Sequence, residues 1–378
     1  MTDSFKGKEK MSNDTVSLHG LFKAAARHSA SDLHIKVGKP PILRIAGDLR
    51  NLETKPFSRE ETEALLMPML SEDQKNHLAK LGGVDFAYSA PGVGRFRVNV
   101  FKQRGSISMA ARRVLTDVPS FEELHLPPVM SRLAGYRQGM VIVAGVTGSG
   151  KSTTLAAILD DISQRRRCHI LTIEDPIEYL LADKLAFINQ REVGIDTPSF
   201  KAALKHMVRE DPDVILIGEM RDEETFSAGL AAAETGHLVL GTLHSSTVAS
   251  TFSRILDFFS ADQHEQIRQS LVFNLRSIVC QKLLPSIKDD VDVVPATEVM
   301  LMTPIMQKLI RDREDSKISD AIRGSAEEGM HDFTESIRGL VAGGFVELNV
   351  GLEAATNPEA LRMALKGIKL GDSSGILG

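Results

Sequence analysis

The sequence has no tryptophan and only two cysteines, and both shortages narrow what the chain can be. Cys168 and Cys280 lie far apart and form no CxxC pair, which excludes a disulfide framework and a four-cysteine zinc site. The lack of Trp, the net charge of -5 and the absence of a long basic block argue against nucleic-acid binding. We therefore expect free thiols in a reducing compartment and no nucleic-acid partner.

Long hydrophobic runs are absent too. No run approaches the roughly 18 apolar residues that a membrane span needs. The N-terminal stretch MTDSFKGKEKMSNDT lacks the apolar core of a secretory signal. These absences predict a soluble, cytoplasmic chain that reaches a membrane only through a partner protein.

The first third of the sequence predicts a small α+β domain. Residues 1–14 are polar and predict a disordered tail. Residues 15–117 mix helical spacing with alternating strands, including two short strands in SDLHIKVGKPPILRIAGDLR. Within this domain, Ser58 followed by Glu61 predicts a capping box at the start of a helix.

The pattern then changes. The stretch TDVPSFEELHLPPV, rich in proline and polar residues, predicts an interdomain linker over 118–135. Residues 136–345 contain the short apolar runs GMVIVAG, HILTIE, DVILIGE and HLVLGTLH. Runs that are apolar on both faces predict a mostly parallel sheet with helices on both faces, the α/β class. Beyond about 260 we expect helices, with one strand near 293–300, and residues 346–378 are assigned to a C-terminal tail.

The stretch GVTGSGKST, residues 145–153, matches the phosphate-loop pattern G-x-x-x-x-G-K-[ST]. It lies between a predicted strand and a predicted helix, which is the context that the motif requires. Lys151 is expected to reach the β- and γ-phosphates, and the Ser152 hydroxyl to ligate Mg²⁺. The residues predicted to bind nucleotide are Gly145, Thr147, Gly148, Ser149, Gly150, Lys151, Ser152 and Thr153. A glycine-rich turn that binds nothing is the alternative.

Acidic residues follow two of the predicted strands. Glu219 ends the strand of DPDVILIGEMRD, where it would face the ligand crevice and could deprotonate an attacking water. Gly218 stands where a magnesium-holding Asp is usual, so Glu219 acts alone or shares that role. Glu174, Asp175 and Glu178 crowd the other strand end, in IEDPIEY, and need a compensating cation or Arg. Solvated surface acids are the alternative for both groups.

Two histidines bracket the apolar run of TGHLVLGTLHSST. Seven residues of extended chain place His237 and His244 about 23 Å apart on opposite faces. They cannot share one metal ion, so each must act separately or serve packing.

Arginines of the first domain form a further candidate group. The stretch RFRVN places Arg95 and Arg97 on one face of a strand, and Arg112 follows before the linker. Guanidinium groups on one face can clamp a polyphosphate. A solvated strand face is the alternative.

The ordered set GVTGSGKSTT, TIEDPIEY, NQREVG, DPDVILIGEMRD and AAETGHLVLGTLHSST resembles the secretion ATPase superfamily. Within it, the chain is most similar to the type IV pilus retraction ATPases of the PilT/PilU twitching-motility family. SDLHI, RIAGDLR and RFRVNVF agree, and the resemblance spans about residues 20–345. It implies a hexameric ring of subunits, each with a PAS-like N-terminal domain and a RecA-like P-loop ATPase domain.

The resemblance also implies roles for individual residues. Lys151, Ser152 and Thr153 match the Walker A box, and Glu219 matches the catalytic glutamate. Glu174, Asp175 and Glu178 match the Asp box. His237 and His244 match the His box, in which His244 is expected to sense the γ-phosphate and His237 to have a structural role. The arginine-finger candidates are Arg97, Arg112, Arg95 and Arg254.

The resemblance thus implies a cytoplasmic ATP- and Mg²⁺-dependent motor for pilus retraction, bound to an inner-membrane platform protein and with a paralogous retraction ATPase as a further partner. Of the expected C-terminal signature only Ala321, Ile322 and Arg323 agree, and EEGMHDFTESIRGLVAGGF looks closer to the accessory PilU branch. The alternatives are a type II secretion or competence-type assembly ATPase, a regulatory subunit without turnover of its own, and a DNA helicase. The larger N-terminal region and cysteine-bearing insert of extension motors are absent, which disfavours pilus assembly.

Overall fold

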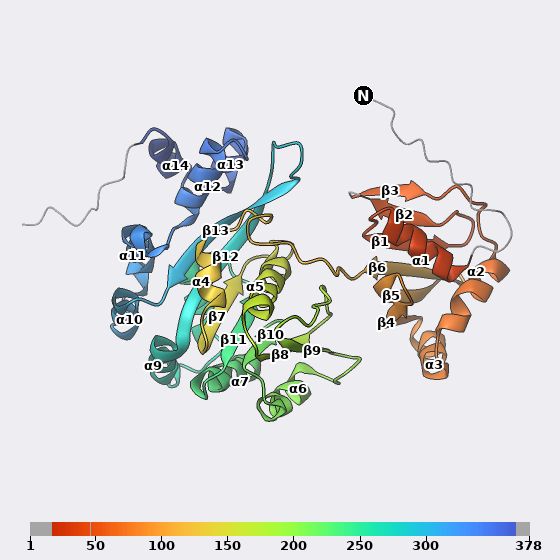
Figure 1. Ribbon diagram of the computed structural model, residues 1–378, viewed down its shortest axis with the longest axis horizontal. Helices are drawn as coiled ribbons and strands as arrows, with labels where there is room; N and C mark the ends of the chain where they lie inside the picture. The colour runs from red at the N-terminus through yellow and green to blue at the C-terminus, as the bar shows by residue number, and fades with distance from the viewer. Residues whose placement is uncertain (1–16, 46, 368–378) are drawn as a thin grey trace, which may run out of the picture. The chain divides into compact units, whose positions relative to one another are not determined.

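A computed structural model describes residues 17–45 and 47–367 of the chain, and the predicted tail 1–14 lies outside them. The chain divides into two compact units with the boundary after Thr116 (Figure 1). Each unit has its own hydrophobic cluster, so each is described by itself.

The first unit is built on a six-stranded antiparallel sheet of order β3-β2-β1-β6-β5-β4. Phe22 and Phe96 pack at its centre with ring centroids 4.3 Å apart. The predicted capping box forms, because Ser58 accepts from the Glu61 amide while Glu61 accepts from the Ser58 amide. The elements are α1 (Leu18–Arg27), β1 (Asp32–Lys36), β2 (Ile42–Ile45), β3 (Asp48–Asn51), α2 (Arg59–Leu66), α3 (Glu72–Leu81), β4 (Gly83–Ala90), β5 (Gly94–Gln103) and β6 (Ser106–Arg113).

The second unit contains a seven-stranded sheet of order β13-β12-β7-β11-β10-β8-β9. Its neighbours are parallel except for the antiparallel pair of β12 and β13. The strands are β7 (Gly139–Ala144), β8 (His169–Glu174), β9 (Phe187–Glu192), β10 (Val214–Ile217), β11 (Leu238–Leu243), β12 (Leu275–Pro285) and β13 (Val293–Leu301). Every residue of β7, β10 and β11 is buried, which accounts for their continuous apolar sequences. The predicted fold class is confirmed.

Helices cover this sheet (Figure 1). They are α4 (Val129–Ala134), α5 (Lys151–Arg165), α6 (Phe200–Met207), α7 (Glu223–Glu234), α8 (Val248–Leu256), α9 (His264–Asn274), α10 (Pro304–Arg311), α11 (Ile318–Gly324), α12 (Phe333–Ala342), α13 (Leu348–Ala354) and α14 (Pro358–Leu365). None of the described helices is both long and apolar enough to span a bilayer.

The structure differs from the sequence-based expectation in four places. The strand β12 lies in the region beyond residue 260 where helices and a single strand near 293–300 were expected. The interval 118–135 contains α4, whose Met130 and Leu133 are fully buried in the core of the second unit. The interval 346–378, predicted as a tail, contains α13 and α14, and Leu361 is fully buried. In the first unit a third strand, β3, follows the two that were expected between residues 31 and 50.

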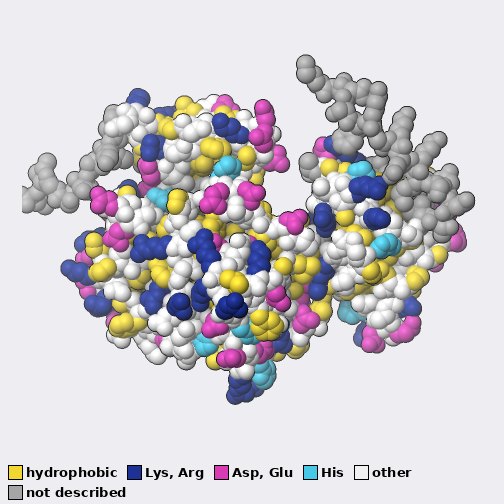
Figure 2. Space-filling view, viewed as in Figure 1, with side chains coloured by type: hydrophobic (Ala, Val, Ile, Leu, Met, Phe, Trp, Pro, Cys, Tyr) yellow, Lys and Arg dark blue, Asp and Glu magenta, His cyan; other side chains and the backbone are white. Residues whose placement is uncertain are grey.

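Both cysteines are free thiols, as predicted, with Cys280 buried and Cys168 partly exposed. Figure 2 shows basic and acidic side chains interspersed with apolar and neutral ones on the viewed face of each unit.

Candidate functional site

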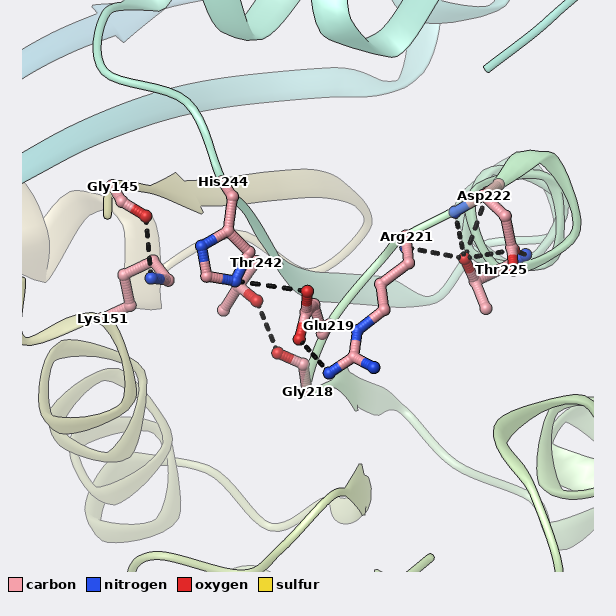
Figure 3. Close-up of polar contacts among 9 residues, drawn as sticks. All are labelled: Gly145, Lys151, Gly218, Glu219, Arg221, Asp222, Thr225, Thr242 and His244. Atoms are coloured by element: carbon pink, nitrogen blue, oxygen red, sulfur yellow. Dashed lines mark hydrogen bonds and ion pairs between the residues drawn. The ribbon is translucent and has the colours of Figure 1, made fainter. Parts of the chain in front are cut away.

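The phosphate loop connects the end of β7 to the start of α5. Gly148 and Gly150 have φ values of 80° and 87°, a left-handed conformation that glycine adopts without a side-chain clash. Among the described residues no side chain caps α5, so its first amide groups remain available for an anion. Lys151 folds back over the loop, where its Nζ donates to the carbonyl oxygens of Gly145 at 2.8 Å and Val146 at 3.0 Å (Figure 3).

A buried glutamine of β12 supports this loop from the neighbouring strand. Gln281 Nε2 donates to the Ser149 carbonyl oxygen at 2.8 Å, and its Oε1 accepts from Thr154 Oγ1 at 2.8 Å. Gln281 was not among the predicted site residues, because nothing in its local sequence links it to a loop about 130 residues earlier. Finding it required the strand order, which places β12 directly beside β7.

Glu219 lies just beyond the carboxyl end of β10, and two basic side chains hold its carboxylate. Its Oε1 is 3.2 Å from His244 Nε2, and Arg221 donates to its Oε2 at 2.6 Å (Figure 3). Burial acts to raise the pKa of Glu219, but the hydrogen bond and charge of Arg221, together with His244 and Lys151, outweigh it and hold the pKa below its usual value. Glu219 is therefore ionised near neutral pH. The sequence analysis assigned no role to Arg221.

Lys151 faces the same carboxylates. Burial lowers the pKa of Lys151, and the negative charges of Glu219 and Glu178 act in the opposite direction. Thr242, on the neighbouring β11, donates from Oγ1 to the Gly218 carbonyl oxygen at 2.5 Å and so fixes the backbone beside Glu219.

The three acidic residues of the predicted Asp box differ in their exposure to solvent. Glu174 ends β8, and its Oε1 accepts from Thr172 Oγ1 at 2.6 Å and from Gln190 Nε2 at 3.0 Å. Burial raises the pKa of Glu174. Asp175 and Glu178 are exposed. Asp175 and Glu178 are thus exposed on this side of the cleft, whereas the carboxyl group of Glu174 is hydrogen-bonded within the cleft wall.

These groups line one cleft with a volume of about 650 Å³. Its walls include Thr147 to Thr153, Glu174, Asp175, Glu178, Glu219 and His244. The loop is joined to the Asp-box wall by a hydrogen bond of 3.2 Å between Thr153 Oγ1 and the Tyr179 hydroxyl. The cleft therefore gathers the helix start, a lysine and several carboxylates that the sequence analysis had selected separately.

The cleft offers oxygen ligands for Mg²⁺. Within residues 17–45 and 47–367 there is no group of three or more His, Cys, Asp or Glu side chains placed to hold a metal ion. Mg²⁺ does not need such a cage, because one or two protein oxygens, nucleotide phosphates and waters complete its shell. The Ser152 hydroxyl and the carboxylates of Glu178 and Glu219, which line the same cleft, fit this requirement.

Three predicted site residues of the second unit, Gly145, His237 and Arg254, are not among the residues that line the cleft, although Gly145 begins the phosphate loop. His237 precedes β11, at the opposite end from His244, and its Nδ1 contacts the Ala232 carbonyl oxygen at 2.9 Å. Arg254, on α8, packs over the ring of Phe258 at 5.1 Å from its centroid. Arg254 is exposed, and the roles of His237 and Arg254 stay predictions.

The other arginine candidates belong to the first unit. Arg97 of β5 and Arg112 of β6 are direct cross-strand partners, so their side chains share one face of the sheet. Arg112 Nε donates to Asp32 Oδ1 at 2.9 Å, and Arg97 is exposed. Arg95 lies two residues before Arg97 on β5 and is half-buried. The pairing makes Arg97 and Arg112 neighbours on one face of the sheet. Strand alternation places Arg95 on that same face.

Comparison with known proteins gives consistent results. The Type II/IV secretion system protein family matches residues 120–317. The chain is 40% identical to the type IV pilus retraction ATPase PilT of Pseudomonas aeruginosa over 339 residues, covering 90% of this chain and 98% of that protein. It is 39% identical to the type IV pilus ATPase PilU of the same organism over 354 residues, covering 94% and 92%.

A solved structure is also similar. The crystal structure of the pilus retraction motor PilT with bound ADP superposes with a TM-score of 0.86 at 40% identity. The match covers 92% of this chain and 99% of that one.

Proposed function

This chain belongs to the Type II/IV secretion system protein family, and within it to the type IV pilus retraction ATPases, and on that premise we propose that it is a hexameric motor that couples Mg-ATP hydrolysis to pilus retraction. The observation that carries the proposal is the cleft in which the phosphate loop faces Glu219 and His244. Its charge and shape suit a nucleoside triphosphate and a water molecule beside the terminal phosphate.

Nucleotide binding follows from the loop and the helix start. The amide groups at the start of α5 offer hydrogen bonds and a positive dipole end to phosphate oxygens. The Lys151 ammonium, now on the Gly145 and Val146 carbonyl oxygens, can reach a phosphate by rotating its side chain. A bound Mg²⁺ would neutralise phosphate charge, held by the Ser152 hydroxyl and a neighbouring carboxylate.

The chemical step rests on Glu219. As an ionised carboxylate beside the cleft, it can accept a proton from the attacking water. His244 is within hydrogen-bonding distance of Glu219 and can donate to a terminal phosphate oxygen, which couples the sensing of that phosphate to the position of the base. Glu178 supplies a second carboxylate at the cleft. Arg97, Arg112 and Arg95 are proposed as arginine fingers for the developing phosphate charge.

The proposal includes partners and a location. We propose a ring of six copies of this 41.3 kDa chain, working in the cytoplasm against an inner-membrane platform protein of the pilus. Mass photometry of the purified chain with ATP tests the ring. A species of six subunits is expected, and a strictly monomeric protein under all nucleotide conditions would contradict it.

A second candidate function is an accessory motor that acts beside a paralogous retraction ATPase. The observation that favours it is the similarity to PilU, which at 39% identity is nearly as high as the 40% to PilT and covers slightly more of this chain. The two functions differ in autonomy, since an accessory motor needs the paralogue to be present.

Expression in Pseudomonas aeruginosa lacking PilT, PilU or both separates the two functions. Restored twitching in the double mutant supports an autonomous retraction motor. Restoration only where PilT is present supports the accessory role. If pilus assembly or secretion changes while retraction does not, the retraction proposal is wrong. The Lys151→Ala variant, which lacks the phosphate-binding ammonium, serves as the inactive control in each strain.

A further inference from the structure

Gln281 lies on β12, the strand that joins the parallel part of the sheet to its antiparallel edge. Its side chain is only 4% exposed, although it is polar and uncharged. A buried amide needs partners for both its donor and its acceptor. Gln281 finds both in the segment that carries the phosphate loop.

The two ends of the amide hold two different parts of that segment. Nε2 donates to the carbonyl oxygen of Ser149, inside the loop, and Oε1 accepts from the Thr154 hydroxyl, in the first turn of α5. The bonds therefore fix the loop relative to the helix start. The position of the loop relative to the start of α5 decides whether the amides of the loop and those of the helix point at the same phosphate.

The contact is close enough to set the shape of the loop. A Cβ placed on Gly150 would lie 2.7 Å from Gln281 Nε2, and one on Gly145 would lie 2.5 Å from the Gln281 carbonyl oxygen. Both glycines are thus required by the approach of β12 as well as by their positive φ values. Gln281 packs into the space that the missing side chains leave.

Gln281 is itself held from behind. It pairs directly with Thr297 of β13. The Thr297 amide donates to Ser336 Oγ of α12 at 3.0 Å, and Thr297 Oγ1 is 2.8 Å from His331 Nε2. The glutamine therefore stands on a strand pair that is anchored to the C-terminal helices, which makes it a rigid support.

We propose that Gln281 is a positioning residue of the nucleotide site, which holds the phosphate loop in the shape that binds a triphosphate. The proposal rests on the proposed function, because it assumes that this loop binds ATP. Gln281 acts through Ser149 and Thr154 and does not touch the nucleotide. Loss of the Gln281 side-chain amide should weaken nucleotide binding while the chain still folds.

The test measures the binding of a fluorescent ATP analogue to the purified full-length chain and, separately, KM and kcat for ATP. Gln281→Met keeps the volume and removes both hydrogen bonds, and we expect roughly tenfold weaker binding and a matching rise in KM. Thr154→Val removes one of these two bonds, the one from Thr154 Oγ1 to Gln281 Oε1, and should also weaken binding. The double variant should lose less than the sum of the two, because the residues share one interaction.

Ser277→Ala is the matched control. Ser277 is a fully buried hydrogen-bonding residue of the same strand, and its Oγ donates to the Met300 carbonyl oxygen, away from the loop. Its variant should bind the analogue as the unmodified chain does. Thermal melting of each variant identifies a folding defect, and Thr154→Val provides the test if Gln281→Met does not fold.

The outcomes separate the two proposals. If the unmodified chain binds no nucleotide, or binds as weakly as Lys151→Ala, the proposed function fails and the positioning role with it. If the unmodified chain binds and folded Gln281→Met binds equally well, only the positioning role is overturned. Equal losses in Gln281→Met and Ser277→Ala would likewise reduce Gln281 to a general structural residue.

Discussion

At the scale of single residues, the main feature of the cleft is the carboxylate of Glu219, which has a basic neighbour on each of its two oxygens. Glu219 receives a hydrogen bond from Arg221 on one oxygen and lies beside His244 on the other. Both neighbours favour its charged form, which a base requires. Each carboxylate oxygen can accept a second hydrogen bond, so a water molecule can approach Glu219 while both neighbours stay in place.

Replacing Glu219 by Gln tests its role as the base. The amide keeps the size of the side chain but cannot accept the proton, so we expect nucleotide binding to persist while ATP turnover falls at least about 100-fold. Steady-state phosphate release and analogue binding measure the two effects. Glu234→Gln, the same change at an exposed position on α7, should leave both unchanged. Loss of nucleotide binding in Glu219→Gln would show a ligand-holding role instead.

Replacing Arg221 by Gln tests the electrostatic contribution to Glu219. The pKa of Glu219 lies below its usual value, so the carboxylate stays charged as the pH falls. Removal of the Arg221 charge and hydrogen bond should raise that pKa. The acidic limb of the kcat profile should then move to higher pH, with the activity near neutral pH less affected.

The pH profile of Arg311→Gln, an exposed arginine of α10, gives the comparison for this experiment. Its acidic limb should coincide with that of the unmodified chain. An acidic limb that does not move in Arg221→Gln would mean that another group sets it.

At the scale of elements, the sequence predicted what is locally encoded. Strands such as β7 and β11 were found because nearly all of their residues are apolar, and the phosphate loop was found because its glycine spacing is specific. The α/β class and membership of the retraction ATPase family are confirmed by the sheet and the comparisons. The roles assigned to Glu219, Glu178, His244 and the arginines stay predictions.

Elements that depend on distant partners were missed. β12 was assigned to a helical region because the apolar residues of LRSIVCQKLLP are interrupted by polar ones without the strict alternation that would indicate a strand. It becomes a strand because it pairs with both β7 and β13. The helices α13 and α14 are short, and it is packing against the second unit that stabilises them.

The packing of α14 gives a prediction about stability. Leu361 is fully buried, so Leu361→Ala should lower the free energy of unfolding of the second unit by about 2–5 kcal/mol. Leu348→Ala makes the same change on α13 at a side chain that is 46% exposed and should cost far less. Urea denaturation followed by circular dichroism compares the two. A loss of unfolding free energy in Leu361→Ala as small as that in Leu348→Ala would mean that α14 does not belong to the cooperative core.

At the scale of the whole molecule, the two units have separate hydrophobic clusters. Each cluster is formed by residues of one unit, so each unit can unfold as its own cooperative transition. Calorimetry of the chain should resolve two transitions. Phe96→Ala, which empties part of the first core, should lower one melting temperature and leave the other in place. A single transition that shifts as a whole would contradict independent cores.

The resting position of Lys151 has a consequence for which anions the cleft admits. Its ammonium already has two carbonyl partners in its own loop, at 2.8 and 3.0 Å. An incoming anion therefore meets an occupied donor and must displace those partners. A small ion that offers only charge gains little from the exchange, whereas a chain of phosphates also satisfies the amides at the start of α5. The loop thus favours an anion with several phosphate oxygens over an ion that offers charge alone.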